Sequence, residues 1–251
     1  VKTMWGDISI AFLLAFVTAF VITPYTIRLA NKVGAIDIPE KRRINEKPTP
    51  RLGGIAVIIG FLVSCIYLIT IMTLEKTLNI FGEEQYFHKL IGLLLGILIL
   101  AIFCYIDDVK GLPAIVKLIG QTIAAIVVVS FGVRIDNITI PFLEQTLNIN
   151  NNIYIYILSV GWIIGITNAI NLIDGLDGLS SGITLISCFS LIIVFTMNES
   201  PIIAIVLITA LAGAIVGFLP YNFNPAKTFI GDTGAQFLGF SLAVISILRN
   251  C

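Results

Sequence analysis

The sequence predicts an all-α fold: a polytopic integral membrane protein built as a helical bundle. The first observation is composition, because 57% of the 251 residues are hydrophobic, only 12% are charged, and the mean hydropathy is +1.01. A water-soluble core of this size cannot hide so much apolar surface. The second observation is that long apolar segments recur along the whole chain. We therefore expect one multi-pass membrane domain over residues 1–251.

About eight apolar segments are candidate transmembrane helices. A helix needs about 17 to 25 residues to cross roughly 30 Å of hydrocarbon, and the segments meet this length, although the sixth and eighth are slightly short. The first is too long for the apolar part of a cleaved signal peptide, so we interpret it as a true span. In chain order the segments are residues 8–30, 53–74, 90–106, 113–132, 153–169, 182–197, 201–219 and 235–248.

The basic residues predict the orientation of the chain. The connector between the first two segments is rich in lysine and arginine, and the positive-inside rule assigns it to the cytosol, which places the N-terminus outside. With alternating crossings, ten of the fifteen basic residues then face the cytosol: Arg28, Lys32, Lys41, Arg42, Arg43, Lys47, Arg51, Lys110, Lys117 and Lys227. The connectors that follow the first, third, fifth and seventh segments are therefore expected on the cytosolic side.

Three polar turns between apolar segments contain the candidate site residues, and all three fall on the cytosolic side. They contain the pair Asp107 and Asp108, the group Asn171, Asp174 and Asp177, and the single Asp232. Unpaired carboxylates at a membrane need a cation, and few lysines lie nearby. This deficit favours a hard divalent cation with oxygen ligands, Mg²⁺ first and Mn²⁺ second. Solvated helix ends for the pair and a capping role for Asp232 are the structural alternatives.

Helix direction adds a preference for anions. The fourth, sixth and eighth segments all begin at the cytosolic face, where the positive ends of their helix dipoles attract phosphate. Lys117 and Gln121, four residues apart, share one face of the fourth segment. Arg51 could reach a phosphate, or could belong to an ordinary basic loop at the lipid surface. Carboxylates, helix N-termini and lysines at a bilayer surface together indicate phosphoryl transfer from a nucleotide donor to a membrane lipid.

The same motifs resemble those of the polyprenyl-phosphate N-acetylhexosamine-1-phosphate transferases. The resemblance covers nearly the whole chain and is carried by N-A-I-N-L-I-D-G-L-D-G-L, by D-D-V-K-G-L-P followed by K-L-I-G-Q, and by N-P-A-K-T-F-I-G-D-T-G. The segment P-T-P-R-L-G-G is similar to the branch that loads N-acetylglucosamine-1-phosphate onto undecaprenyl phosphate. The alternative within the family is the phospho-N-acetylmuramoyl-pentapeptide transferase branch, which usually lacks arginine there.

The resemblance implies a role for each motif. Asp107 and Asp108 match the paired catalytic aspartates, and Asp232 matches the magnesium ligand. Binding of the donor and acceptor substrates is implied for Asn171, Asp174, Asp177, Asn222, Phe229, Lys117 and Arg51, with Asn222 and Phe229 lining the uridine pocket. The implied partners are a UDP-sugar, undecaprenyl phosphate and the bilayer of the cell membrane, with a second copy of the chain as a candidate and no nucleic acid.

Two departures from the family pattern accompany the resemblance. The chain stops at Cys251 and lacks the histidine-rich cytosolic loop that members of the family usually have, which suggests a truncated chain. It also has Ala235 where a serine is common and Asn45 where a histidine is common.

Two alternatives of other classes are a catalytically inactive structural protein and a transporter or channel. The tripeptide Asn224-Pro225-Ala226 favours the latter, but it occurs only once and the two halves show no matching repeat.

Overall fold

Helices make up most of the chain in the computed structural model, which describes residues 2–39, 47–74, 84–140, 145–149, 151–198 and 200–248. Within these residues each predicted segment forms one helix, and the termini of the helices differ from the prediction by a few residues. The helices are α1 (Lys2–Val33), α2 (Gly53–Leu74), α3 (Glu84–Lys110), α4 (Ala114–Ser130), α5 (Asn152–Leu172), α6 (Leu179–Met197), α7 (Ile202–Asn222) and α8 (Gly231–Ile247).

Two short antiparallel hairpins modify the all-helical prediction. Strand β1 (Ile36–Asp37) pairs with β2 (Thr49–Pro50) in the connector between α1 and α2. Strand β3 (Asn137–Ile140) pairs with β4 (Gln145–Asn148) before α5. The first hairpin brings the start of the connector next to its end, so the segment before α2 is held close to the bundle.

Within the residues that the structure describes, five helical segments are long and apolar enough to cross a membrane, by length and composition: Ile8–Val33, Phe87–Lys110, Asn152–Leu172, Leu179–Met197 and Ile202–Asn222. The protein is therefore a membrane protein. Within α7 almost every side chain from Ile203 to Phe218 is buried, so this helix lies in the interior of the bundle. Neighbouring helices surround α7, which explains why it is apolar all round rather than on one face.

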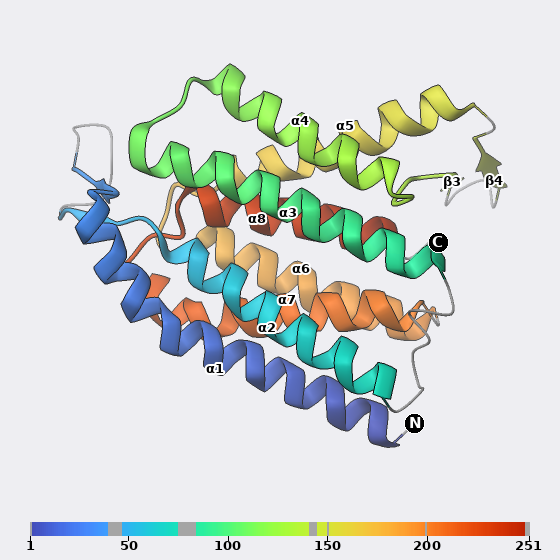
Figure 1. Cartoon of the computed structure of the whole chain (residues 1–251), viewed down its shortest axis with the longest axis horizontal. Coiled ribbons are helices and arrows are strands. Elements are labelled where there is room, and N and C mark those ends of the chain that lie inside the picture. Colours follow the sequence, from blue (N-terminus) through green and yellow to red (C-terminus); the bar gives the residue numbers. More distant parts are fainter. Residues whose placement is uncertain are drawn as a thin grey trace.

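The helices alternate in direction and form two packed groups (Figure 1). One group contains α1, α2, α6 and α7, and the other contains α3, α4, α5 and α8. In the second group α4 and α8 each pack against both α3 and α5, so the four helices surround a common interior. The connectors α1–α2, α3–α4, α5–α6 and α7–α8 all lie at one end of the molecule, which we call the connector face.

Glycines let α2 begin directly against the start of α8. A Cβ atom on Gly54 would lie 2.2 Å from the Cα atom of Gly234, so no larger side chain fits without moving backbone. The approach is fixed by two backbone hydrogen bonds, in which the Gly53 and Gly54 amides donate to the carbonyls of Phe229 and Ile230, at 3.0 and 2.8 Å. The missing side chains of this glycine pair therefore allow the protein's own backbone to approach closely.

Candidate functional site

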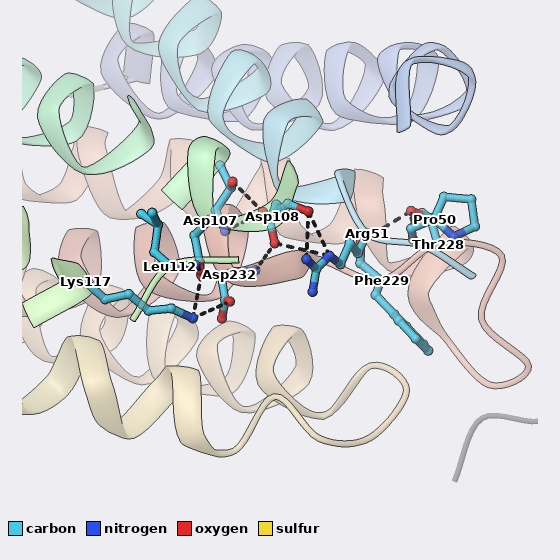
Figure 2. A network of polar contacts seen from close by, with 10 residues as sticks. Pro50, Arg51, Asp107, Asp108, Leu112, Lys117, Thr228, Phe229 and Asp232 are labelled. Carbon is cyan, nitrogen blue, oxygen red and sulfur yellow. Dashed lines mark hydrogen bonds and ion pairs between the residues drawn. The ribbon is translucent and has the colours of Figure 1, made fainter. Parts of the chain in front are cut away.

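Three charged side chains from three helices meet at the connector face. The Lys117 ammonium, in the first turn of α4, lies 2.5 Å from Asp107 Oδ2 and 3.0 Å from Asp232 Oδ2. Asp107 is buried in the last turn of α3, whereas the Asp232 side chain, in the first turn of α8, is 27% exposed. Figure 2 shows Lys117 extended toward the two carboxylates. Residues separated by 125 positions in the sequence thus share one cation.

Asp108 has a different environment from Asp107. Its carboxylate accepts hydrogen bonds from the backbone amides of Asp232 and Thr233, at 3.0 and 2.9 Å, and from the Thr233 hydroxyl at 2.5 Å. It therefore supplies a negative charge at the N-terminus of α8, which the helix dipole favours. We expected the start of α8 to attract an anion, and in the structure that anion is Asp108. Asp232 itself does not cap the helix, which begins at Gly231 after Ile230.

Arg51 connects the first hairpin to the same site. Its guanidinium donates from Nε and Nη2 to the backbone carbonyl of Asp108, at 3.0 and 2.7 Å, and Nε lies 3.9 Å from Asp108 Oδ1. Figure 2 shows Arg51 approaching Asp108 from the side opposite Lys117. The arginine thus satisfies a carbonyl at the end of α3, where helical partners are lacking. Its side chain remains 28% exposed at the connector face.

Asp174 and Asp177, in the connector between α5 and α6, accept hydrogen bonds from different partners. Asp174 accepts a hydrogen bond from the Ser180 hydroxyl at 2.6 Å. Burial raises the pKa of the Asp174 carboxyl from its ordinary 3.8 to about 6; the Ser180 hydrogen bond lowers it, and the charge of Asp232 raises it further. Asp177 accepts bonds from the Asn224 side chain and the Ala226 amide, both at 3.0 Å, so it holds the α5–α6 connector against the α7–α8 connector.

The other three predicted substrate residues lie around these connectors. Asn222 is 2% exposed and is bonded to the Ser181 hydroxyl and the Thr228 carbonyl, so its amide braces the connector. The backbone of Phe229 bonds Pro50 and Gly53, whereas its ring points away from the charged cluster (Figure 2). Asn171 is half-buried in the last turn of α5. All ten predicted residues therefore lie at the connector face. The side chains of Asp107, Lys117 and Asp232 form one charged cluster, and Arg51 contacts Asp108 beside it.

The geometry of that cluster fits a cation with oxygen ligands. The Lys117 ammonium shows that the Asp107 and Asp232 carboxylates are close enough to share one positive charge. Among the described residues, no group of three or more histidine, cysteine, aspartate or glutamate side chains could hold a metal ion by itself. Mg²⁺ typically uses one or two carboxylates and completes its shell with water and substrate phosphates. One buried carboxylate, Asp107, and one partly exposed carboxylate, Asp232, are compatible with that preference.

A second polar cluster lies one helical turn further into the bundle, and we call Gln121, Asn168 and Gln236 the amide layer. Gln121 and Gln236 are both buried, and Gln121 bonds to the other two side chains. Sequence reasoning placed Gln121 on the face of Lys117 but missed its partners, and it also missed Thr233. The available signal was spacing, since Gln236 follows Asp232 by four residues as Gln121 follows Lys117.

Comparison with known proteins finds relatives that are named as sugar-phosphate transferases. It is 38% identical over 245 residues to a "Probable undecaprenyl-phosphate N-acetylglucosaminyl 1-phosphate transferase" of Bacillus subtilis (strain 168), which covers 96% of this chain and 63% of that protein. It is 33% identical to a "Decaprenyl-phosphate N-acetylglucosaminephosphotransferase" of Mycobacterium leprae, covering 87% of this chain and 55% of that protein. The chain thus spans less than two thirds of the length of these relatives.

A third relative belongs to the other branch considered above. A "Phospho-N-acetylmuramoyl-pentapeptide-transferase" of Staphylococcus epidermidis is 31% identical, and the alignment covers 96% of this chain and 75% of that protein. The family model described as "Glycosyl transferase family 4" matches residues 90–250, which contain the aspartate pair, the lysine and both later acidic turns. Because this match covers more than half of its length, the chain belongs to glycosyl transferase family 4.

Proposed function

We propose that the protein transfers a sugar-1-phosphate from a UDP-sugar to undecaprenyl phosphate and releases UMP. The sugar-1-phosphate that we propose is N-acetylglucosamine-1-phosphate. The observation that carries this proposal is the cluster of Asp107, Lys117 and Asp232, formed by three helices that begin or end at the same face. The names of the Bacillus and Mycobacterium relatives support this class of acceptor and sugar. Family membership also favours transfer chemistry over the transporter or channel interpretation.

The proposed topology places this reaction where both substrates can reach it. We infer that all eight helices cross the cell membrane and that the connector face is cytosolic, as the basic residues predict. A UDP-sugar then approaches from the cytosol, while a lipid phosphate approaches from the surrounding bilayer. The exposed edge of Asp232 and the half-buried Lys117 lie at this boundary. Asn171, Asp174, Asp177, Asn222 and Phe229 surround it and are proposed to form the donor side.

In the proposed reaction an oxygen of the lipid phosphate attacks the sugar-bearing phosphorus of the UDP-sugar. A P–O bond forms to the lipid phosphate as the P–O bond to UMP breaks, and UMP leaves with the electron pair. Because the second pKa of a phosphate monoester is about 6, the lipid phosphate is already mostly dianionic at neutral pH. Asp107 therefore acts mainly by positioning the acceptor, and Lys117 supplies positive charge beside the phosphates.

Two carboxylates supply a place for the expected magnesium ion. Asp232 is the proposed ligand, with Asp107 close enough to share the same cation. When bound, Mg²⁺ neutralises charge on the diphosphate, and Mn²⁺ is expected to substitute. Asp108 is proposed to support the site from behind, because its carboxylate is engaged with the first turn of α8.

Formation of a lipid-linked sugar diphosphate tests the proposed function directly. Purified protein in mixed micelles is given undecaprenyl phosphate and a mixture of UDP-sugars, with and without Mg²⁺, and the lipid product is identified by mass spectrometry. We expect UMP release and a product with N-acetylglucosamine, and a loss of at least about a hundredfold in Asp107→Asn and Asp232→Asn, as for removal of a charge-stabilising group. Full activity of either variant would contradict the assigned roles.

The second candidate is transfer of phospho-N-acetylmuramoyl-pentapeptide. The observation that favours it is the Staphylococcus relative, 75% of whose length is covered by the alignment. The same mass spectrum distinguishes the two candidates, because the pentapeptide donor gives a much heavier lipid product. Including UDP-N-acetylmuramoyl-pentapeptide in the donor mixture therefore decides between the branches in one experiment.

A further inference from the structure

The amide layer repeats the geometry of the charged cluster one helical turn deeper. Lys117 and Gln121 lie four residues apart on α4, and Asp232 and Gln236 lie four residues apart on α8. Lys117 Nζ is 3.0 Å from Asp232 Oδ2, and Gln121 Nε2 donates to Gln236 Oε1 at 2.9 Å. Because α4 and α8 both run away from the connector face (Figure 1), the two contacts are successive rungs between the same pair of helices.

Asn168 attaches these rungs to a third helix. Its amide nitrogen donates to Gln121 Oε1 at 2.6 Å and to the Ile164 carbonyl of its own helix at 2.9 Å. Gln121 Nε2 also lies 3.3 Å from Asn168 Oδ1. Since α5 packs against both α4 and α8, the Gln121 amide is held from two sides. Rotation of α4 about its axis would break these bonds and swing Lys117 away from the carboxylates.

Burying the polar side chain of Gln236 costs free energy that a purely structural residue would not require. Its side chain is 1% exposed, and its Nε2 atom has no hydrogen-bond partner among the described residues. A buried donor without a partner costs free energy, whereas an apolar side chain of the same shape avoids that cost. Methionine would fill a similar volume in this apolar bundle. Stability alone therefore does not account for glutamine here.

We propose that Gln121 and Gln236 are positioning residues that hold α4 in the register at which the Lys117 ammonium meets Asp107 and Asp232. Lysine has a flexible four-carbon stem and a compact charge, so its position depends on how the helix beneath it is fixed. The two amides supply that fixed point, and Asn168 anchors it to α5. The catalytic consequence rests on the proposed transferase function, whereas the structural consequence for Lys117 does not.

The decisive variant is Gln236→Met, because it removes the rung and the unpaired donor together. We expect the thermal stability of Gln236→Met to equal or exceed that of the wild type, while kcat falls about tenfold and KM for the UDP-sugar changes by less than about twofold, since the donor side is untouched. Gln121→Met removes the same hydrogen bond from the other helix and should lower kcat similarly. It should also lower the stability of the protein, because the Asn168 and Gln236 amides lose a hydrogen-bond partner.

Chemical modification of Lys117 gives a readout that does not require activity. The intact detergent-solubilised protein is treated briefly with an amine-acylating reagent, and modification of Lys117 is quantified by peptide mass spectrometry relative to the exposed Lys110. An ammonium held between two carboxylates reacts slowly, so we expect Lys117 to be modified several times faster in both glutamine variants. Thr122→Val is the matched control, because Thr122 is on α4 and its hydroxyl donates to the Leu118 carbonyl of its own helix.

The outcomes separate the positioning role from the proposed function. Unchanged Lys117 modification in a folded Gln236→Met protein overturns the positioning role, and if that variant does not fold, the same comparison in Gln121→Met decides. A fall in kcat with unchanged modification also overturns it, since the effect would then not act through Lys117. If modification rises as expected but the wild type transfers no sugar phosphate, the positioning role stands and the transferase proposal fails.

Discussion

Asp107 and Asp108 are adjacent in sequence, but their carboxylates serve different parts of the molecule. Asp107 faces Lys117 and the charged cluster, and its second oxygen accepts the Leu112 amide at 2.6 Å. Asp108 is turned toward the first turn of α8 and is bonded to Thr233. Consecutive residues of a helix point about 100° apart, so a pair of like charges can be divided between two partners. Asp107 is therefore the member of the pair that takes part in the charged cluster.

Lys117 is the residue whose removal should change metal binding most clearly. Its ammonium lies where a cation would be attracted, between Asp107 and Asp232. In Lys117→Met we expect Mn²⁺ to bind about tenfold more tightly, because removing one nearby positive charge is worth about 1 kcal/mol or more at this distance. Mn²⁺ titration followed by electron paramagnetic resonance measures the affinity, and transfer activity should be lost in the same variant.

The stability of the protein without metal supplies a second test of Lys117. Loss of the ammonium leaves two carboxylates facing each other, so Lys117→Met should melt at a lower temperature than the wild type in chelator and gain more from added Mn²⁺. Lys110→Met, at the exposed end of α3, serves as the control for loss of a lysine near the same face. Weaker Mn²⁺ binding by Lys117→Met would show that the lysine assists the cation rather than competing with it.

Asp174 predicts a pH dependence of stability. Burial raises the pKa of its carboxyl to about 6 in the folded protein, so the folded state favours the neutral acid, and stability from this residue is lost as the pH rises through about 6. Asp174→Asn keeps an acceptor for Ser180 and carries no charge. We expect this variant to be about 1 to 2 kcal/mol more stable than the wild type at pH 8, with the difference vanishing by about pH 4.

Melting temperatures at a series of pH values, measured without metal or substrate, check this prediction. Ser180→Ala is the matched variant, because it removes the hydrogen bond that lowers the pKa of Asp174. In the Ser180→Ala background the pH range over which Asp174→Asn gains its advantage should move upward. A stability difference that is the same at pH 5 and pH 8 would mean that Asp174 titrates at its ordinary value.

At the scale of elements, the contact between the starts of α2 and α8 holds two connectors together. Gly54→Ala introduces a Cβ atom 2.2 Å from backbone of Gly234, which cannot yield as a side chain can. We expect a loss of about 3 kcal/mol or more in the free energy of unfolding, the upper range for overpacking. Chemical denaturation in mixed micelles, or the melting temperature where unfolding is irreversible, measures the effect.

Gly161→Ala is the control for Gly54→Ala, because it adds the same side chain at a glycine without a close neighbour in the described part of the chain. Gly161 lies within α5, and a Cβ atom there has nothing within 4 Å among the described residues. Alanine has the higher helix propensity, by about 1 kcal/mol in exposed helices, so this variant should be as stable as the wild type or more stable. Equal effects of the two substitutions would contradict a specific close approach at Gly54.

The helices could be predicted from the sequence because each one contains a long apolar segment bounded by polar turns. Their termini shifted where polar residues extend a helix, as at α3, which continues through Asp107 and Asp108 to Lys110. Hydropathy gives no signal for such extensions, because the last turn is held by contacts with other helices. The β1–β2 hairpin was also missed, since each strand has only two residues.

The sequence predicted which residues lie at the candidate site, but not which of them contact one another. The three polar turns stand out because charged residues are costly beside hydrocarbon, and all of them lie at the connector face. Which aspartate faces Lys117 depends on the relative rotation of α3, α4 and α8, which no local pattern encodes. For the same reason Gln236 looked like an ordinary helix residue, although it bonds to Gln121 at a sequence separation of 115.

At the scale of the whole molecule, the two ends of the bundle differ in chemistry. The connector face contains the acidic turns, Lys117 and Arg51. Hydrogen bonds such as those of Asp177 and Thr228 hold the α7–α8 connector against the α5–α6 and α1–α2 connectors. The opposite end contains the start of α5 and the β3–β4 hairpin. A reaction that consumes a cytosolic nucleotide sugar requires the connector face to be inside the cell.

The orientation of the bundle can be tested with one cysteine at each end. Cys65, Cys104 and Cys188 are buried, and all four native cysteines are replaced by serine before Lys110→Cys or Asn152→Cys is introduced at an exposed position. In intact bacterial cells, a membrane-impermeant maleimide should label Asn152→Cys, and it should label Lys110→Cys only after the cells are permeabilised. The positive-inside rule predicts this result, because the sequence is expected to place ten of the fifteen basic residues on the side of Lys110. The reverse pattern would place the charged cluster outside the cell, away from any UDP-sugar, and would contradict the proposed reaction as well as the topology.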